Sequence, residues 1–282
     1  MQLAYSTNAF TRFDLSESLQ QIAALGFAGV EILCDRPHWF PGQVDRSALD
    51  DVKAILTETG LRVSNLNANT ANGYYSPLPP ENVFEPALTN PDEKLRRWRE
   101  NYTIEAVRLA REVGARCVSV TSGRPTSACE PERSIAYFVE SLVRICGVAA
   151  DYGVRIGIEY EPGLLVERAS EALDVIRAVG SPVLGVNLDI GHSFLDGEPV
   201  EETVSALEGR IWNVHVEDIK DRKHFHRVPG DGELPFQRYL HALRGIGYGG
   251  FLTVELYSYP DKPVEAGSRA LAYLTALLGE NP

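Results

Sequence analysis

The chain has few cysteines, no long apolar run and fewer basic than acidic side chains. No two of its four cysteines are three or four residues apart, which excludes zinc-knuckle spacing. No run reaches the roughly 18 apolar residues that a membrane-spanning helix needs. Against 39 Asp and Glu stand only 27 Lys and Arg, a formal net charge of −12, which disfavours nucleic acid and anionic membranes as partners.

Two further absences bear on location and fold. The N-terminus, MQLAYST, lacks a basic start followed by a long apolar stretch, so we expect no signal peptide. We interpret the cysteines as reduced thiols and expect a cytoplasmic protein. The segment STNAFTRF after the first predicted strand lacks the Gly-rich turn of a doubly wound sheet, which disfavours that runner-up fold.

Short apolar strands alternate with longer amphipathic helices along the whole chain. This alternation gives eight strand–helix units in 282 residues, and a (β/α)8 barrel needs roughly 250. No linker or shift of composition marks a boundary, so we predict a single TIM-barrel domain over residues 1–282. The predicted strands are 3–6, 28–33, 62–66, 117–121, 154–159, 183–188, 211–216 and 251–256, and the helices are 15–25, 47–59, 93–113, 131–152, 170–179, 200–207, 236–246 and 264–278.

Acidic and histidine side chains stand where the last four predicted strands end. The carboxyl ends of barrel strands face one another across one mouth, where converging carboxylates and an imidazole would bind a divalent cation. Such an oxygen-rich set favours Mn²⁺, Mg²⁺ or Co²⁺, and Zn²⁺ also accepts it. The residues are Glu159 in RIGIEYEP, Asp189 and His192 in GVNLDIGH, His215 in IWNVHVED and Glu255 in FLTVELYS, and all but His192 are the predicted ligands.

Some neighbouring residues allow two interpretations each. Glu161 shares the inward face of its strand with Glu159 and is an alternative ligand. His192 either contacts a substrate hydroxyl or caps a turn. Glu31, which ends the second strand, either hydrogen-bonds substrate or is a surface carboxylate. His38 in CDRPHWFPG lies among aromatic residues that either stack on a sugar or pack a loop.

Two predicted loops on the same side of the barrel are long, and long ordered loops are usually functional. They cover residues 67–92 and 219–235. The second contains a locally basic run, 220–227, with Arg222 and His226 as candidate substrate contacts. It either binds a phosphate or carboxylate of the substrate or is a solvated face.

The order and spacing of these motifs resemble the sugar isomerase/epimerase superfamily with xylose-isomerase-like barrels, which also contains the type IV apurinic endonucleases. The matching pieces are GFAGVEI, GIEYEP, NLDIGH, HVED followed by PGDGELPF, and TVEL. The resemblance implies one divalent metal on Glu159, Asp189, His215 and Glu255, with the two glutamates also moving the proton. It implies substrate contacts at His192 and Arg222. Ketose 3-epimerases and hydroxypyruvate isomerase are among its members.

The leading hypothesis is therefore a metal-dependent isomerase or epimerase of a sugar, sugar phosphate or polyol. The metal, with Mn²⁺ as first candidate, would stabilise an enediolate while Glu159 and Glu255 remove and return the proton. A homo-oligomer is left open. Three alternatives remain: a dehydratase of a cyclic polyol or sugar acid, a DNA-repair endonuclease, and a non-catalytic protein with a structural metal. The endonucleases use three zinc ions and many histidines, whereas this chain has six, and we place His38, His224, His226 and His241 off the strand-end cluster.

Overall fold

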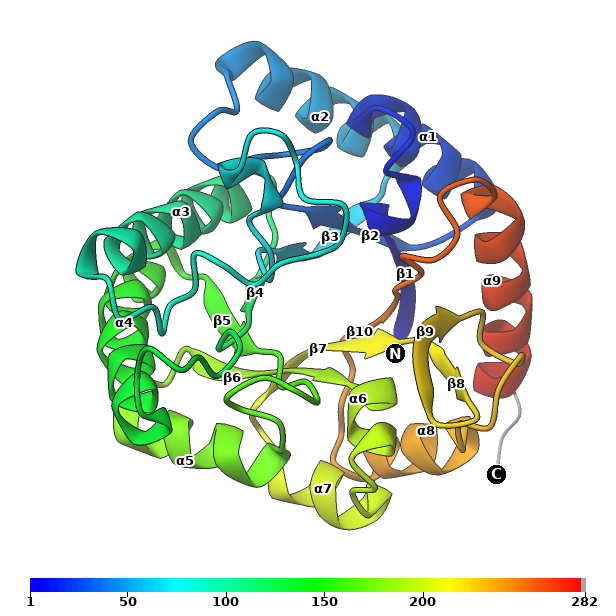
Figure 1. Cartoon of the computed structure of the whole chain (residues 1–282). Coiled ribbons are helices and arrows are strands. Elements are labelled where there is room, and N and C mark those ends of the chain that lie inside the picture. Colours follow the sequence, from blue (N-terminus) through cyan, green and yellow to red (C-terminus); the bar gives the residue numbers. More distant parts are fainter. Residues whose placement is uncertain (280–282) are drawn as a thin grey trace.

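The computed structural model describes residues 1–279 and confirms the predicted (β/α)8 barrel. Eight parallel strands close in the order β1-β10-β7-β6-β5-β4-β3-β2, and Figure 1 looks along the axis of this barrel. The strand labelled β10 is the eighth barrel strand, because a hairpin precedes it. The barrel strands are β1 (Gln2–Ser6), β2 (Gly29–Leu33), β3 (Arg62–Asn67), β4 (Cys117–Val120), β5 (Arg155–Ile158), β6 (Leu184–Asp189), β7 (Ile211–Val216) and β10 (Phe251–Val254).

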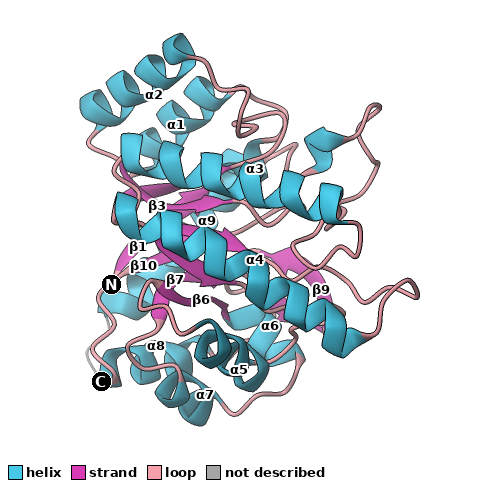
Figure 2. Cartoon of the chain, turned by 90° about the vertical axis from the view of Figure 1, so that its left-hand side faces the viewer, coloured by secondary structure: helices cyan, strands magenta, loops and turns pink. Residues whose placement is uncertain are grey.

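Helices form the outer layer, which Figure 2 shows from the side. The segment after β6, which no predicted strand or helix covers, forms a short helix, α6. No helix within residues 1–279 combines the length and the apolarity that crossing a membrane requires. The helices are α1 (Leu15–Leu25), α2 (Arg46–Thr59), α3 (Glu93–Glu112), α4 (Pro131–Tyr152), α5 (Ala169–Val179), α6 (Ile190–Leu195), α7 (Val200–Ala206), α8 (Phe236–Gly245) and α9 (Pro263–Gly279), with 3-10 turns η1 (Thr7–Phe10) and η2 (Asn72–Tyr74).

Local chemistry sets the ends of the helices, as α1 shows. The Asp14 side chain accepts a hydrogen bond from the Glu17 amide (2.8 Å) and caps the first turn. Gly26 ends the helix at φ 96°, a left-handed conformation that glycine adopts without a steric penalty. The bounds of α1 agree with the helix predicted over residues 15–25.

The loop after β7 contains a two-stranded antiparallel hairpin, which the sequence reading missed. Its strands are β8 (Asp218–Lys220) and β9 (Lys223–Arg227), joined by two residues of positive φ. The buried Asp218 carboxylate accepts hydrogen bonds from four backbone amides, those of Ile219, Gly230, Gly232 and Leu234 (2.8–3.1 Å). One side chain thus fixes both the start of the hairpin and the chain that returns from it.

The long loop after β3 is tied down from both sides. Asp35 accepts hydrogen bonds from the Thr70 hydroxyl (2.7 Å) and from the amides of Asn72 and Gly73 (2.6 and 2.8 Å). On the other side Arg99 of α3, which is 1 % exposed, donates to the carbonyl oxygens of Pro86, Ala68 and Asn69. These contacts hold the part of the loop that borders the mouth of the barrel.

Candidate metal centre at the barrel mouth

Four side chains from four consecutive barrel strands converge at the carboxyl end of the barrel. Each offers a ligand atom within 4.8 Å of the others, and none is more than 3 % exposed. They follow or end β5, β6, β7 and β10, which are neighbours in the closed sheet. The structure therefore brings together the four predicted ligands Glu159, Asp189, His215 and Glu255.

The imidazole of His215 is oriented by a carboxylate on one side and faces the other three on the opposite side. Its Nε2 lies 2.6 Å from Glu31 Oε2. Its Nδ1 lies 3.1 Å from Glu159 Oε2, 3.5 Å from Glu255 Oε2 and 4.0 Å from Asp189 Oδ2. A hydrogen bond from Nε2–H to Glu31 makes Nδ1 the acceptor, and the Asn187 Nδ2 amide lies 3.1 Å from it. A cation that replaced this amide would find the carboxylate–histidine–metal arrangement.

Glu31 was expected either to hydrogen-bond substrate or to be a surface carboxylate, and the structure places it inside the barrel beside His215, so it is not a surface residue. Its side chain is fully buried, and its Oε1 accepts from the Ser6 hydroxyl (2.8 Å) and Asn67 Nδ2 (3.1 Å). Its Oε2 accepts from Asn65 Nδ2 (2.8 Å) and faces His215. Because both oxygens are engaged inside the barrel, the geometry gives Glu31 a positioning role.

Asparagine amides form a layer of donors around the carboxylates, which the sequence reading missed. Asn8 Nδ2 and Asn67 Nδ2 donate to Glu255 Oε1 (2.9 and 3.1 Å). Asn69 Nδ2 donates to Glu159 Oε2 (2.9 Å). The sequence did contain a pattern that could have predicted this layer. Asn65, Asn67 and Asn69 stand at every second position along β3 and its end, and all three point inward.

The buried carboxyl groups of the cluster lie close together, and their pKa values depart from the usual range. Burial raises the pKa of Asp189 to about 7, with the neighbouring carboxylates of Glu217 and Glu159 adding to the effect. Burial likewise raises the pKa of Glu255 well above its usual range, although His215 opposes it. Burial alone would also raise the pKa of Glu159, but the charge and hydrogen bond of His215, together with His192 and Asn69, outweigh burial and lower this pKa to about 2.

These observations fit a divalent cation. Within the described residues, the buried Asp189 Oδ2 has no hydrogen-bond partner, although it faces the centre of the cluster. Three carboxylates and one imidazole are a donor set that accepts Mn²⁺, Mg²⁺, Co²⁺ or Zn²⁺. Glu159, Asp189, His215 and Glu255 are the residues that would hold the ion.

His192 lies beside this cluster because Asp189 also caps the helix that carries it. Asp189 Oδ1 accepts from the amides of Gly191 (2.7 Å) and His192 (3.1 Å) at the start of α6. The His192 ring is buried, with Nδ1 3.1 Å from the Tyr160 carbonyl oxygen and Nε2 3.9 Å from Asp189 Oδ2. The side chain therefore borders the mouth, where its predicted contact with substrate stays a prediction.

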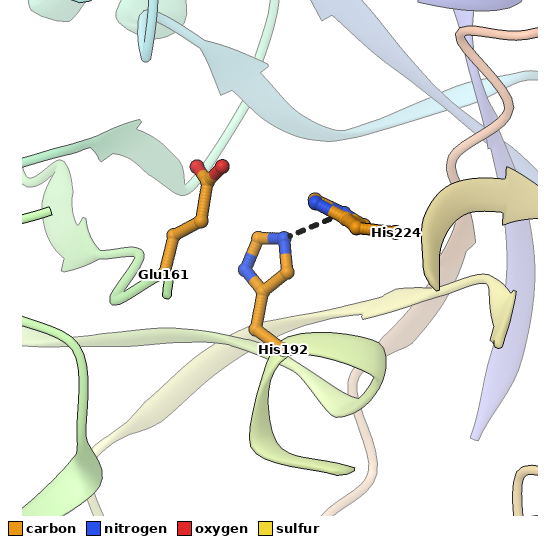
Figure 3. A group of neighbouring side chains, drawn as sticks. All are labelled: Glu161, His192 and His224. Atoms are coloured by element: carbon orange, nitrogen blue, oxygen red, sulfur yellow. Dashed lines mark hydrogen bonds between the residues drawn. The ribbon is translucent and has the colours of Figure 1, made fainter. Parts of the chain in front are cut away.

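The hairpin brings two further histidines, which were expected to lie off the strand-end cluster, to the border of that cluster, and neither belongs to its four residues. His226 Nδ1 lies 2.9 Å from Glu217 Oε2 and 3.6 Å from Glu255 Oε2, and His224 Nε2 lies 3.0 Å from Glu217 Oε1. Glu161 has ligand atoms near His192 and His224 (Figure 3) and is not part of the four-residue cluster. The position of Glu159 in the cluster thus favours Glu159 over Glu161 as the ligand.

Two predicted substrate contacts are not brought into the cluster. Arg222 is exposed at the hairpin turn, where its guanidinium donates to the Leu195 carbonyl oxygen at the end of α6. The His38 ring is mostly enclosed, with Nε2 3.3 Å from the Phe13 carbonyl oxygen, and burial lowers its pKa to about 4. A role of either side chain in substrate binding stays a prediction.

The closed (β/α)8 barrel and the acidic and histidine cluster at its carboxyl end are typical of metal-binding barrel enzymes. Residues 19–277 match the family model described as the xylose isomerase-like TIM barrel, and the chain belongs to this family. The sequence resemblance is thereby confirmed.

Two named relatives match all or nearly all of the chain. It is 25 % identical to fructoselysine 3-epimerase of Shigella flexneri over 286 residues, which span 100 % of this chain and 99 % of the relative. It is 26 % identical to a putative hydroxypyruvate isomerase of Streptomyces coelicolor, over 93 % of this chain and 94 % of the relative. The crystal structure of the IOLI protein with a binding zinc atom superposes with a TM-score of 0.80 at 20 % identity, over 99 % of this chain and 98 % of that one. At this identity the superposition shows the shared fold alone.

Proposed function

We propose that the chain is a divalent-metal-dependent isomerase or epimerase of a sugar, sugar phosphate or related polyol, acting through an enediolate. The observation that carries the proposal is the convergence of Glu159, Asp189, His215 and Glu255 around the Nδ1 atom of the histidine. The names of the two sequence relatives, an epimerase and an isomerase, support the reaction class.

One divalent ion on the four-residue cluster is part of this proposal, with Mn²⁺ as first candidate and Mg²⁺, Co²⁺ and Zn²⁺ as alternatives. Three of the four candidate ligands are carboxylates and only one is an imidazole, and this excess of oxygen over nitrogen supports a hard cation. The zinc atom of the structurally similar IOLI protein supports a divalent one. When bound, the ion would supply Lewis-acid stabilisation of the negative charge that develops as a proton leaves carbon.

The chain's own residues would hold and move that proton. Glu159 and Glu255 follow the outer two of four neighbouring strands and therefore approach the centre from its two flanks. A carboxylate on one flank would remove the proton from the substrate carbon, and a carboxylic acid on the other would return one. The amides of Asn8, Asn67 and Asn69 fix the orientation of both groups.

The space near the cluster suits a small polar substrate. A cavity of about 310 Å³ opens between the loops that follow β1, β2, β3 and β10. Its lining is mostly polar and includes Thr70, Asn82 and Tyr257. The Tyr257 ring packs against His226, with ring centroids 5.4 Å apart, which places the cavity beside the cluster. Hydroxyl, amide and carbonyl groups in such a cavity would pair with sugar hydroxyls.

Isotope exchange in D₂O tests the proposed reaction. The protein would be stripped with a chelator, loaded with Mn²⁺ and incubated in D₂O with a panel of ketoses, aldoses and their phosphates. We expect an isomer or epimer that carries solvent deuterium at one carbon and has lost no water. A product with a new double bond would favour the dehydratase alternative. No turnover of any panel member with Mn²⁺, Mg²⁺, Co²⁺ or Zn²⁺ would contradict the proposal.

Removing the charge below the cluster should weaken the proposed metal site. In Glu31→Gln we expect the affinity for Mn²⁺ to fall about 10- to 100-fold, because the variant loses the carboxylate that orients His215. Calorimetric titration of the metal-free protein measures the change. Glu17→Gln, an exposed carboxylate of α1, is the matched control and should bind as the wild type does. Equal affinity of Glu31→Gln and wild type would remove the positioning role.

A further inference from the structure

A cavity of about 650 Å³ opens at the amino-terminal end of the barrel, the end opposite the four-residue cluster. In Figure 2 this end lies on the left, where N marks the start of the chain, while the hairpin strand β9 lies on the right. The cavity is lined by the first residues of six strands and by the loops that lead into them. Three of its lining residues are arginines, and none is an aspartate or a glutamate.

The three arginines stand where three neighbouring strands begin. Arg62 and Arg155 are the first residues of β3 and β5, and Arg116 directly precedes β4, which lies between them in the sheet. The Arg155 amide donates to the Arg116 carbonyl oxygen (2.8 Å), so these two backbones are adjacent. The fold therefore gathers three positive charges at one edge of the barrel, although the chain as a whole has a net charge of −12.

Aromatic rings, rather than carboxylates, hold two of these side chains in place. The guanidinium carbon of Arg155 lies 4.2 Å from the centroid of the Trp212 ring, and that of Arg62 lies 4.9 Å from the centroid of the Phe251 ring. A cation is attracted to the face of an aromatic ring. Such a stack uses the flat face of the guanidinium and leaves the N–H groups at its edge available to an acceptor.

Two glycines make room for these rings inside the barrel. A Cβ atom at Gly29 would collide with the Phe251 ring, and one at Gly185 would collide with the Trp212 ring. Trp212 itself stands where the register of β7 against β6 shifts. The strand sequences thus provide the space for a ring beside each of the two arginines.

No acid neutralises the three arginines in the described part of the chain. Between residues 1 and 279, none of their guanidinium groups has a carboxylate oxygen within 4.0 Å or donates a hydrogen bond. Exposed arginines elsewhere on the surface do pair, as Arg97 does with Glu93 and Arg238 with Glu201. Like charges around one cavity repel one another, so an anion that enters it lowers the electrostatic energy.

The number and geometry of the donors indicate the kind of anion. A guanidinium fork matches the oxygens of carboxylate and phosphate groups. Three forks around one cavity suit a group with more than one negative charge and several oxygens, as a phosphate or diphosphate has. The volume lies within the roughly 300–1,000 Å³ of sites for small organic ligands, which leaves space for an organic part. Apolar side chains complete much of the lining, among them Leu61, Val113, Ile246 and Tyr248.

We propose that the chain binds a small organic phosphate or diphosphate in this cavity. The phosphate oxygens would lie against Arg62, Arg116 and Arg155, and the organic part against the apolar side chains. The site lies at the opposite end of the barrel from the proposed metal, so the inference does not depend on the reaction catalysed. The chain then has a second ligand besides its substrate.

Titration calorimetry of the metal-free full chain with inorganic pyrophosphate and with ADP tests this site. Metal is left out because both probes bind divalent ions, and the carboxylates of the metal-free mouth repel an anion. We expect one equivalent of each probe with a Kd below about 1 mM, and weaker binding as salt is added. ADP should bind at least about threefold more tightly than pyrophosphate, because its organic part gains apolar contacts. Adenosine, which lacks the phosphates, should not bind.

Substitution of the arginines locates the bound probe. In Arg62→Met and in Arg155→Met we expect the affinity for pyrophosphate to fall at least about 10-fold, because each variant loses one charged fork and keeps an apolar chain beside its ring. Arg124→Met is the matched control, since Arg124 also stacks on a ring, that of Phe84 (5.7 Å), but follows β4 at the carboxyl end of the barrel. This control should bind pyrophosphate as the wild type does.

Three results would overturn the inference. One is that the wild type binds neither probe at about 1 mM. Another is that Arg62→Met and Arg155→Met both bind pyrophosphate as tightly as the wild type, because the anion would then lie elsewhere. The third is that ADP binds no more tightly than pyrophosphate, because the site would then accept a free anion only. None of these results bears on the four-residue cluster, which the D₂O screen tests separately.

Discussion

Glu255→Gln should abolish turnover of the substrate found in the D₂O screen while leaving the fold intact. We expect kcat to fall at least about 1,000-fold, because the substitution removes both a proposed proton carrier and a negative ligand. The amide is similar in size and still accepts a hydrogen bond from Asn8 through its carbonyl oxygen. Steady-state kinetics at saturating Mn²⁺, together with thermal unfolding, separate the loss of chemistry from a loss of structure.

The control for this variant is Glu265→Gln, which changes an exposed carboxylate of α9 by the same atoms. It should retain the wild-type rate. If Glu255→Gln bound metal normally and retained more than about a tenth of the wild-type kcat, Glu255 would be excluded as a proton carrier.

Arg99→Met should produce the largest loss of stability. The variant keeps the length of the side chain but leaves the carbonyl oxygens of Pro86 and Ala68 without their buried donor, whereas the Asn69 carbonyl oxygen keeps the Thr121 hydroxyl (3.2 Å). At about 1–3 kcal/mol for each unsatisfied group, partly relieved by relaxation, we expect the free energy of unfolding to fall by about 3–5 kcal/mol. Urea denaturation followed by circular dichroism measures it.

This loss should extend to the site, because the Asn69 side chain holds Glu159. A folded fraction of Arg99→Met should therefore bind Mn²⁺ more weakly than the wild type. Arg108→Met on the same helix changes an exposed side chain that pairs only with Glu105 in the described part of the chain, and it should alter stability by less than about 0.5 kcal/mol. Equal stability of the two variants would show that the loop does not depend on Arg99.

The order of the elements and the four candidate ligands at the strand ends were predictable because both depend on local patterns. Apolar runs mark strands, and the closed parallel barrel then brings every strand end to one mouth. The convergence of Glu159, Asp189, His215 and Glu255 needed no knowledge of side-chain geometry. The family model matched over residues 19–277 agrees with that reading.

The pattern of strands does not tell how far along the barrel axis a side chain lies. Glu31 is an example. It stands on β2 at the register of Ser6 and Asn65, inside the barrel. A strand register cannot be read from one sequence, because shifts such as the one between Val30 and Glu31 leave no pattern. The burial of Glu31 beside His215 therefore could not be predicted from the sequence.

From the sequence, His226 was named only as a candidate substrate contact and His224 was not named as one, because the hairpin that carries both was not predicted. His224 and His226 follow His215 by nine and eleven residues, and only the folding back of β9 returns them to the mouth. The hairpin turn lacks the glycine that usually announces such a turn, because Asp221 and Arg222 take the positive φ angles themselves. Asp218, which anchors the hairpin, accepts hydrogen bonds from backbone amides, and the sequence does not show which amides these are.

The attachment of the hairpin also bears on how barrels of this kind diversify. Asp218 holds the segment through main-chain amides, so the side chains between residues 219 and 229 are free to change without loss of the anchor. A transplant of this stretch between family members should carry its histidines as one unit and leave the eight strands undisturbed. The side chains beside the cluster could then change within this one segment while the barrel that carries the cluster stays the same.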